Sequence, residues 1–214
     1  MKRFFSIFKE NILFIEILIL LAFIPLYPKI PLINVKNTWV YVRVEDFLIL
    51  AVLFSWVFFL IRKKISLRTP LTMPILIFWI IGAIATLNGV LLIFPTLVGV
   101  FPNVAFLALV RHIEYLSLFF VAFAAMKNRA LLRFVVITII ATLVGVILYG
   151  LGQKYFGFPA FLTSNEEFAK GIPIQLSQLS RLPSTFAGHY DLAAYLVIMI
   201  PIIVSLIFGI KNIL

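Results

Sequence analysis

The stretch LTMPILIFWIIGAIATLNGVLLIF, residues 71–94, contains no charged residue. An apolar run of roughly 18 residues or more with few charges is typical of an α-helix that spans a bilayer. This stretch therefore predicts a transmembrane helix. The rest of the chain repeats its pattern.

The composition of the whole chain agrees with a membrane protein. Of the 214 residues, 64% are hydrophobic and 12% are charged, and Phe alone occurs 23 times. Soluble domains have about 25% charged residues. A soluble protein of this length would bury a sizeable core but would still need a polar surface. Too few polar residues are present to cover one.

Five further apolar blocks accompany residues 71–94. The first follows Lys2, Arg3 and Lys9 as a signal peptide would, but no small-x-small cleavage site comes after it, so we expect an uncleaved helix. We predict an all-α fold: a polytopic membrane helix bundle of about six transmembrane helices, forming a single transmembrane domain. The predicted spans are residues 12–27, 47–61, 71–94, 104–126, 131–151 and 188–210. A polar segment, residues 152–187, separates the last two.

Lysine and arginine predict the orientation of these helices. With the N-terminus in the cytoplasm, the cytoplasmic segments hold eleven basic residues and the extracytoplasmic segments hold six. Cytoplasmic loops carry an excess of Lys and Arg, so we expect a cytoplasmic N-terminus and an extracytoplasmic segment 152–187. The cytoplasmic set is Lys2, Arg3, Lys9, Arg62, Lys63, Lys64, Arg68, Lys127, Arg129, Arg133 and Lys211. The opposite set is Lys29, Lys36, Arg43, Lys154, Lys170 and Arg181.

Several function classes are excluded by residues that the chain lacks. It has no cysteine and two histidines, which excludes thiolate zinc sites and His-rich metal sites. The Walker phosphate loop, HExxH, GxSxG and the dinucleotide glycine fingerprint are also absent, so we expect no metal and no cofactor. The net charge of +10 does not indicate nucleic-acid binding, because the basic residues form short clusters between apolar blocks. Such clusters face anionic membrane lipids.

The predicted helix 104–126 contains a first candidate site, Arg111-His112-x-Glu114-Tyr115. A charge in hydrocarbon costs at least about 2.5 kcal/mol, so it normally faces a bundle interior or a wet cavity. Arg111 and Glu114 share one helix face at i,i+3 spacing and can pair. One interpretation is a site for an anionic ligand that opens outward. The other is a buried ion pair that joins two helices.

A second candidate site lies where the polar segment enters the last predicted helix. A helix N-terminus offers free backbone N–H groups and a positive dipole end, which favour phosphate. Arg181 supplies a bidentate phosphate partner, and His189 is able to act as acid or base at neutral pH. Ser184, Thr185 and Gly188 suit a capping turn. The alternative interpretation is helix capping alone, with Asp191 placed favourably in the first turn.

Two weaker features involve acidic residues. Glu16 lies near the middle of the first predicted helix, where it is either a polar group that pairs helices or a proton site; we expect pairing. Arg43, Glu45 and Asp46 precede the second predicted helix and are interpreted as an interface anchor, with lining of a site as the alternative.

The last predicted helix is also where the chain resembles a known family. The motifs RLPSTF, residues 181–186, and LAAYL, residues 192–196, with Pro201, resemble the O-antigen ligase and O-antigen polymerase family. VED at 44–46 and EYL at 114–116 are similar to further recurring sequence features of that family. The resemblance covers nearly the whole chain as a pattern of helices, and the stretch from Arg181 to Pro201 is its most specific part.

The resemblance implies a membrane glycosyltransferase. The family acts on polyprenyl-diphosphate-linked glycans, such as undecaprenyl diphosphate carriers, at the outer face of the cytoplasmic membrane. It polymerises the repeat units or transfers the glycan to an acceptor lipid or glycan during the biosynthesis of surface polysaccharide such as lipopolysaccharide. The chemistry is inverting glycosyl transfer with a lipid diphosphate leaving group. The substrate-binding candidates are Arg181, Ser184, Thr185, Gly188, His189, Arg111 and Glu114, with His189 as a weak catalytic candidate.

The sequence departs from the family in two ways. Where many members have an Asn-Pro-Asn turn, this chain has GHYD at residues 188–191. Family members also carry further spans and a later, larger extracytoplasmic loop with essential Arg and His residues. We therefore expect the chain to correspond to the N-terminal part of a longer protein and to be inactive by itself.

Two other functions fit a polytopic helix bundle. One is a small-solute or ion-coupled transporter subunit, with Glu16, Arg111, His112 and Glu114 as a relay or gate. Transporters of this kind usually show inverted halves or broken helices, and the sequence shows no such symmetry. The other is a non-catalytic membrane scaffold.

Overall fold

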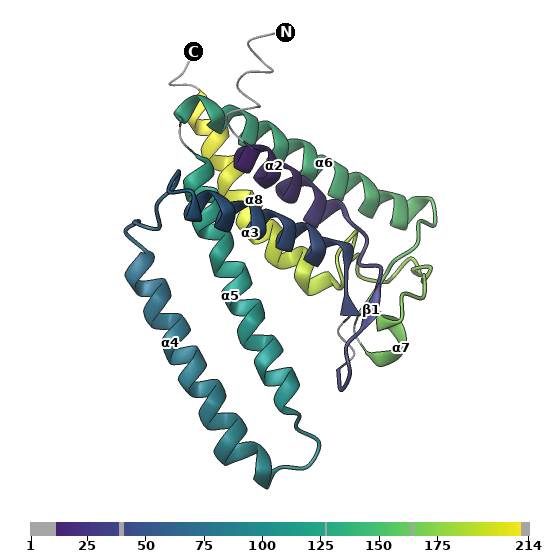
Figure 1. Ribbon diagram of the computed structural model, residues 1–214. Coiled ribbons are helices and arrows are strands. Elements are labelled where there is room, and N and C mark those ends of the chain that lie inside the picture. The colour runs from purple at the N-terminus through teal and green to yellow at the C-terminus, as the bar shows by residue number, and fades with distance from the viewer. Residues whose placement is uncertain (1–11, 39–40, 127, 164, 211–214) are drawn as a thin grey trace. The chain divides into compact units, whose positions relative to one another are not determined.

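The computed structural model describes residues 12–38, 41–126, 128–163 and 165–210, and it confirms the helical fold class. The basic residues Lys2, Arg3, Lys9, Lys127 and Lys211 lie outside the described residues. The helices are α2 (Ile12–Leu26), α3 (Val44–Ile61), α4 (Thr72–Asn88), α5 (Pro102–Ala125), α6 (Leu132–Tyr155), α7 (Glu166–Ala169) and α8 (His189–Ile210) (Figure 1). One short antiparallel strand pair accompanies them, β1 (Ile33–Asn34) with β2 (Tyr41–Val42).

Five of the described helices are long and apolar enough to cross a membrane. They are Val44–Ile61, Thr72–Thr96, Pro102–Ala125, Arg129–Tyr155 and His189–Gly209. The remaining predicted span, residues 12–27, is the first in the chain and corresponds to α2. The described part of α2 is a shorter apolar helix of 15 residues. The chain is thus a multi-pass helical membrane protein by the length and composition of its helices.

The helix bounds differ from the prediction at several ends. α3 begins at Val44 and not at 47, because Glu45 and Asp46 occupy its first turn, where the helix dipole favours acidic side chains. α6 continues to Tyr155 and not only to 151, since the polar Gln153 finds hydrogen-bond partners. Hydropathy excluded both polar ends from the predicted spans.

The segment beyond residue 88 is the most irregular part of a predicted span. α4 passes into a π-helical turn at Gly89–Ile93 and then a 3₁₀ turn at Phe94–Thr96. Leu97 is extended, which ends the helical run. The apolar pattern predicted the length of this span but carried no sign of the change in helix type.

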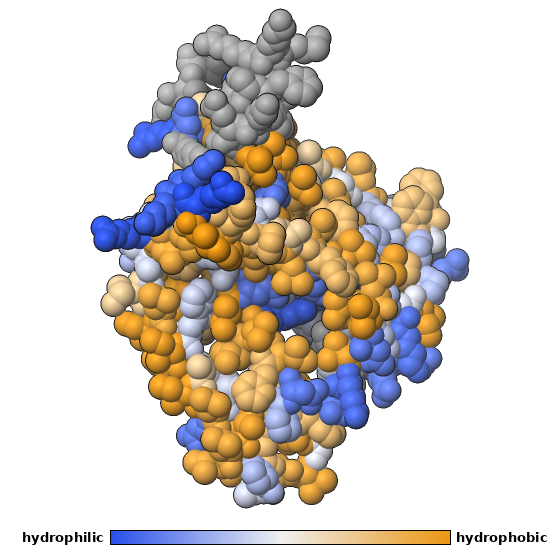
Figure 2. Space-filling view, in the orientation of Figure 1, coloured by the Kyte–Doolittle hydropathy of each residue, from blue (hydrophilic) through white to orange (hydrophobic). Residues whose placement is uncertain are grey.

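Apolar side chains cover much of the surface, as Figure 2 shows. The exposed apolar residues include Met73, Ile80 and Ile84 of α4 and Leu91 and Leu92 of the π-helical turn. In a soluble protein such a surface would be an association site, whereas hydrocarbon chains solvate it in a bilayer. The exposed apolar surface therefore agrees with residence in a membrane.

The chain divides into two compact units, and each is described by itself. The first consists of residues up to 20, 36–38 and 44–135. In it α4 and α5 run antiparallel, with Gly82 of α4 facing Leu109 of α5 at close range (Figure 1). The rings of Trp56 on α3 and Trp79 on α4 both lie against Phe120 of α5, with centroid separations of 6.2 and 6.1 Å.

The second unit consists of residues 21–35, 39–43 and 136–214. In its described part, the polar segment after α6 folds back on that helix. The ring of Phe158 packs on Gly152, and Ala160 pairs with Ile174 in an isolated antiparallel bridge. Gly171, at a φ of 82°, lies against Pro31. The polar segment is therefore a folded cap on α6 and not an extended loop.

Gly152 tests this packing. An added Cβ would lie 2.4 Å from the ring of Phe158, so Gly152→Ala forces the ring or the helix to move. We expect the free energy of unfolding to fall by about 1–3 kcal/mol, as overpacking does elsewhere. The measurement is equilibrium unfolding in mixed micelles.

Gly209→Ala of α8 is the matched control, because among the described residues beyond its own stretch of helix no heavy atom lies within 4 Å of its added Cβ. A helical Gly→Ala change without a clash is neutral or stabilising by up to about 1 kcal/mol. Equal responses of the two variants would show that Phe158 does not pack on Gly152.

Candidate functional site

Arg181 and His189 come together at the start of α8. The Arg181 Nη1 atom lies 3.2 Å from the His189 Nε2 atom. A guanidinium only donates hydrogen bonds, so the histidine ring accepts at Nε2 and carries its proton on Nδ1. The Arg181 side chain is exposed and that of His189 is half-buried. The pair offers a cation and a polar ring on one accessible surface.

The N-terminus of α8 lies beside this pair. The Gly188 carbonyl accepts the first hydrogen bond of the helix, from the Leu192 N–H at 3.3 Å. The first turn of a helix leaves N–H groups without intrahelical partners, and its dipole favours an anion there. His189 is the first helical residue, so the Arg181–His189 pair and the positive helix end face one small region. This arrangement suits phosphate.

A buried hydrogen-bond network holds the turn that carries Arg181. The Ser184 hydroxyl donates to the Val146 carbonyl of α6 at 2.6 Å, and the Thr185 hydroxyl donates to the Pro25 carbonyl. The Gln153 amide donates to the Ser184 carbonyl at 2.9 Å. Ser184 adopts a positive φ of 54°, a conformation that most residues avoid and that surrounding contacts must maintain.

These contacts define what the predicted binding residues Ser184 and Thr185 do. Both side chains are buried and their hydroxyls donate to backbone carbonyls, so they anchor the turn. Their hydroxyls do not cap α8, where Gly188 holds the capping position. Of the five residues predicted around α8, Arg181 and His189 are the two whose side chains meet on the accessible surface.

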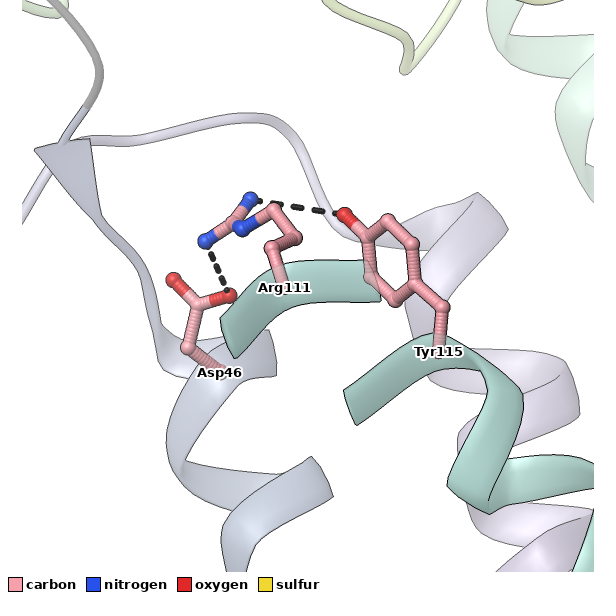
Figure 3. A network of polar contacts seen from close by, with 3 residues as sticks. All are labelled: Asp46, Arg111 and Tyr115. Atoms are coloured by element: carbon pink, nitrogen blue, oxygen red, sulfur yellow. Dashed lines mark hydrogen bonds and ion pairs between the residues drawn. The ribbon is translucent and has the colours of Figure 1, made fainter. Parts of the chain in front are cut away.

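Arg111 forms the second polar cluster, in the first unit. Its Nη2 atom lies 3.1 Å from the Asp46 Oδ1 atom of α3, and its Nη1 atom lies 3.4 Å from the Tyr115 hydroxyl (Figure 3). The side chain of Asp46 is 13% exposed and that of Arg111 is 38% exposed. The ion pair therefore joins α5 to α3.

Glu114 is close enough to Arg111 and Asp46 to interact with both electrostatically. The i,i+3 spacing allowed Arg111 to pair with Glu114, and the observed ion pair is with a polar residue of another helix, Asp46 of α3. The single positive charge of Arg111 thus faces two carboxylates. Among the described residues, this arrangement supports the helix-joining interpretation of Arg111 over the anion-binding one.

Glu16 also lies in the first unit and forms a hydrogen bond there. The Ser55 hydroxyl of α3 donates to the Glu16 Oε1 atom at 2.8 Å. This contact joins α2 to α3, as expected for a polar residue that pairs helices. The other carboxylate oxygen, Oε2, is buried and has no hydrogen-bond partner within the described part of the chain.

The sequence did not predict Asp46 as the ion-pair partner of Arg111, and it did not predict Gln153 as a member of the buried hydrogen-bond network. Asp46 was interpreted as an interface anchor, with lining of a site as the alternative, and it pairs with the partly exposed Arg111 of the neighbouring helix. Gln153 lay at the edge of a predicted span, where its polarity counted against the helix. A buried amide in such a position signals a network, since buried polar groups are normally hydrogen-bonded.

No metal centre is formed within the described part of the chain, where no group of three or more His, Cys, Asp or Glu side chains is placed to hold an ion. Comparisons with protein-family models, with curated proteins and with solved structures found no match to this chain.

The Arg111–Asp46 pair allows a double-mutant cycle. Arg111→Met and Asp46→Asn each remove one charge of the pair, and the double variant removes both. We expect each single variant to lower the free energy of unfolding in mixed micelles, with a coupling energy of about 0.5–3 kcal/mol. Strictly additive effects would show that the ion pair does not join the helices.

The exposed pair Glu167–Lys170 of the second unit is the control cycle. Its Nζ and Oε2 atoms are 2.8 Å apart, and this hydrogen bond raises the pKa of the Lys170 amine. Exposed pairs contribute little to stability, so Glu167→Gln and Lys170→Met should show no measurable coupling.

Proposed function

We propose that this chain is part of an O-antigen ligase- or polymerase-like membrane glycosyltransferase that uses a polyprenyl-diphosphate-linked glycan. The observation that carries the proposal is the Arg181–His189 contact at the N-terminus of α8. It supports a diphosphate site at one end of a membrane helix, beside the motif on which the family resemblance rests. The acceptor is a lipid or a glycan, and no cofactor takes part.

Arg181 has the chemistry that the diphosphate leaving group requires. In the reaction, an acceptor hydroxyl attacks the anomeric carbon and loses its proton to solvent, the bond from that carbon to the diphosphate oxygen breaks, and the bonding pair stays on the lipid diphosphate. A guanidinium binds two phosphate oxygens in parallel and stabilises the charge that develops on them. Arg181 is exposed and adjacent to free helix N–H groups, so it is available for this contact.

His189 serves this proposal as a positioning residue. Its Nε2 lone pair accepts from Arg181, so that nitrogen is not free to take the proton of the acceptor hydroxyl. The contact instead orients the guanidinium over the start of α8. The buried hydroxyls of Ser184 and Thr185 hold the turn by donating to the Val146 and Pro25 carbonyls.

The contacts of Glu16, Arg111 and His112 give less support to the alternative function, a transporter subunit. Glu16 and Arg111 are each engaged by a residue of α3, and the His112 Nδ1 atom lies 2.7 Å from the Ala108 carbonyl of its own helix. These contacts do not connect Glu16, Arg111 and His112 to one another. They favour structural roles for the residues that a relay would need.

Arg181→Lys tests the diphosphate site by binding, without requiring turnover. Lysine keeps the charge but loses the bidentate geometry. Loss of one charge-assisted hydrogen bond costs about 1.5–3 kcal/mol, so the affinity for undecaprenyl diphosphate should fall about tenfold or more. His189→Ala should weaken binding less. Native mass spectrometry or thermophoresis in detergent measures both.

Arg68→Lys is the matched control, because Arg68 is an exposed arginine of the other unit. It should bind undecaprenyl diphosphate as the unchanged chain does. If Arg181→Lys and Arg68→Lys bind equally well, Arg181 is not part of the site. Transfer of a lipid-linked glycan to its acceptor by assemblies that contain each variant then extends the comparison to activity.

We propose a cytoplasmic N-terminus in the cytoplasmic membrane, which places the start of α8 at the outer face. The chain has no native cysteine, so Lys170→Cys and Lys64→Cys each provide a single labelling site. In intact cells, a membrane-impermeant maleimide should label position 170 and not position 64. Labelling of position 64 alone would reverse the orientation and remove the outer-face site.

A further inference from the structure

A band of exposed apolar residues runs along α6 and continues past its end. Val144, Leu148, Leu151 and Tyr155 are all exposed and lie at i, i+4, i+7 and i+11, which places them on one helix face. The band is about 16 Å long at 1.5 Å per residue. On a membrane helix, such an exposed apolar face is the face that lipid covers.

The band does not stop where α6 stops. Tyr155 is 72% exposed and the next residue, Phe156, is 78% exposed. The Phe156 ring lies 6.4 Å from that of Phe158, which in turn lies 5.6 Å from the ring of Tyr149 on α6. The Tyr149 hydroxyl donates to the Pro159 carbonyl at 2.9 Å. The rings of Tyr149, Phe158 and Phe156 thus form a row that runs from α6 into the polar segment.

Leu179 comes to the same end of α6, although it is distant in sequence. The Lys154 amine donates to the Gln178 carbonyl, which brings residue 179 toward the end of α6. Leu179 is 98% exposed. A leucine with this exposure is unfavourable in water, because its apolar area stays hydrated.

We propose that Tyr155, Phe156 and Leu179 form a docking edge that inserts into the headgroup region of the bilayer and holds the segment between α6 and α8 against the membrane surface. The partner is the phospholipid interface, because Tyr155 is the last residue of the lipid-facing band of α6 and the exposed Phe156 follows it directly. Aromatic rings favour that depth. Leu179 is two residues from Arg181, so docking also holds Arg181 near the level of lipid phosphates.

The charges near the edge indicate that docking is driven by apolar contact. In residues 156–188, Glu166 and Glu167 balance Lys170 and Arg181. Lys154 is already engaged by the Gln178 carbonyl. The hydrogen bond leaves the Lys154 charge in place, so residues 154–188 carry a net charge of +1. One net positive charge attracts anionic lipid only weakly, so apolar contact is the main contribution to docking.

Nitroxide labels measure the depth of the edge directly. Leu179→Cys and Tyr155→Cys are single-cysteine variants of a cysteine-free chain, and Gln175→Cys is the control at an exposed polar position of the same segment. In nanodiscs of phosphatidylcholine alone, labels at 179 and 155 should collide with oxygen severalfold more, relative to a water-soluble nickel complex, than the label at 175. Adding one third phosphatidylglycerol should leave these ratios unchanged.

Each other result overturns the proposal. Equal access of nickel to positions 179 and 175 would place the edge in water. Protection of position 179 from both oxygen and nickel would show that protein, and not lipid, covers it. An oxygen preference that appears only with phosphatidylglycerol would show electrostatic attachment. None of these outcomes depends on the binding of undecaprenyl diphosphate, so the test is separate from that of the proposed function.

Discussion

A polar atom in the hydrocarbon of a bilayer has no water to bond with, so it must find its partner inside the protein. This constraint explains the polar contacts that join the helices. In the first unit, Asp46 of α3 accepts from Arg111 of α5, and Ser55 of α3 donates to Glu16 of α2. α3 supplies the partner in both cases. The few polar side chains of the predicted spans are therefore the ones that specify which helices pack together.

The same constraint shapes the candidate site in the second unit. The buried hydroxyls of Ser184 and Thr185 and the NH₂ group of Gln153 donate to backbone carbonyls. With these donors satisfied internally, the turn is fixed in a conformation that includes a positive φ at Ser184. Arg181 and His189 remain on the surface and meet each other. Separate residues thus build the turn and present the cation.

Much of the fold was predictable because hydropathy is a local property. A long uncharged run specifies a helix whatever it packs against, and residues 71–94 needed no further context. Hydropathy failed at the ends of helices, where Asp46 and Gln153 are helical because of partners elsewhere in the chain. It also carried no information about the π-helical turn after Asn88.

The site was predictable in part for the same reason. Arg181 and His189 stood out as the charged and titratable residues beside a helix start, and they do come together. The roles of Ser184 and Thr185 depend on the Val146 and Pro25 carbonyls, which lie 38 and 160 residues away. The partner of Arg111 lies 65 residues away on α3. Such pairings follow from tertiary packing, which no local motif encodes.

We propose that the start of α8, with Arg181, is where this protein holds a diphosphate. The most direct measurement is photo-crosslinking in nanodiscs with a prenyl diphosphate that carries its photoreactive group next to the diphosphate, followed by mass spectrometry of the modified peptides. The account predicts crosslinks within residues 177–192 that inorganic diphosphate competes away. Competable crosslinks confined to α4 and α5 would contradict it.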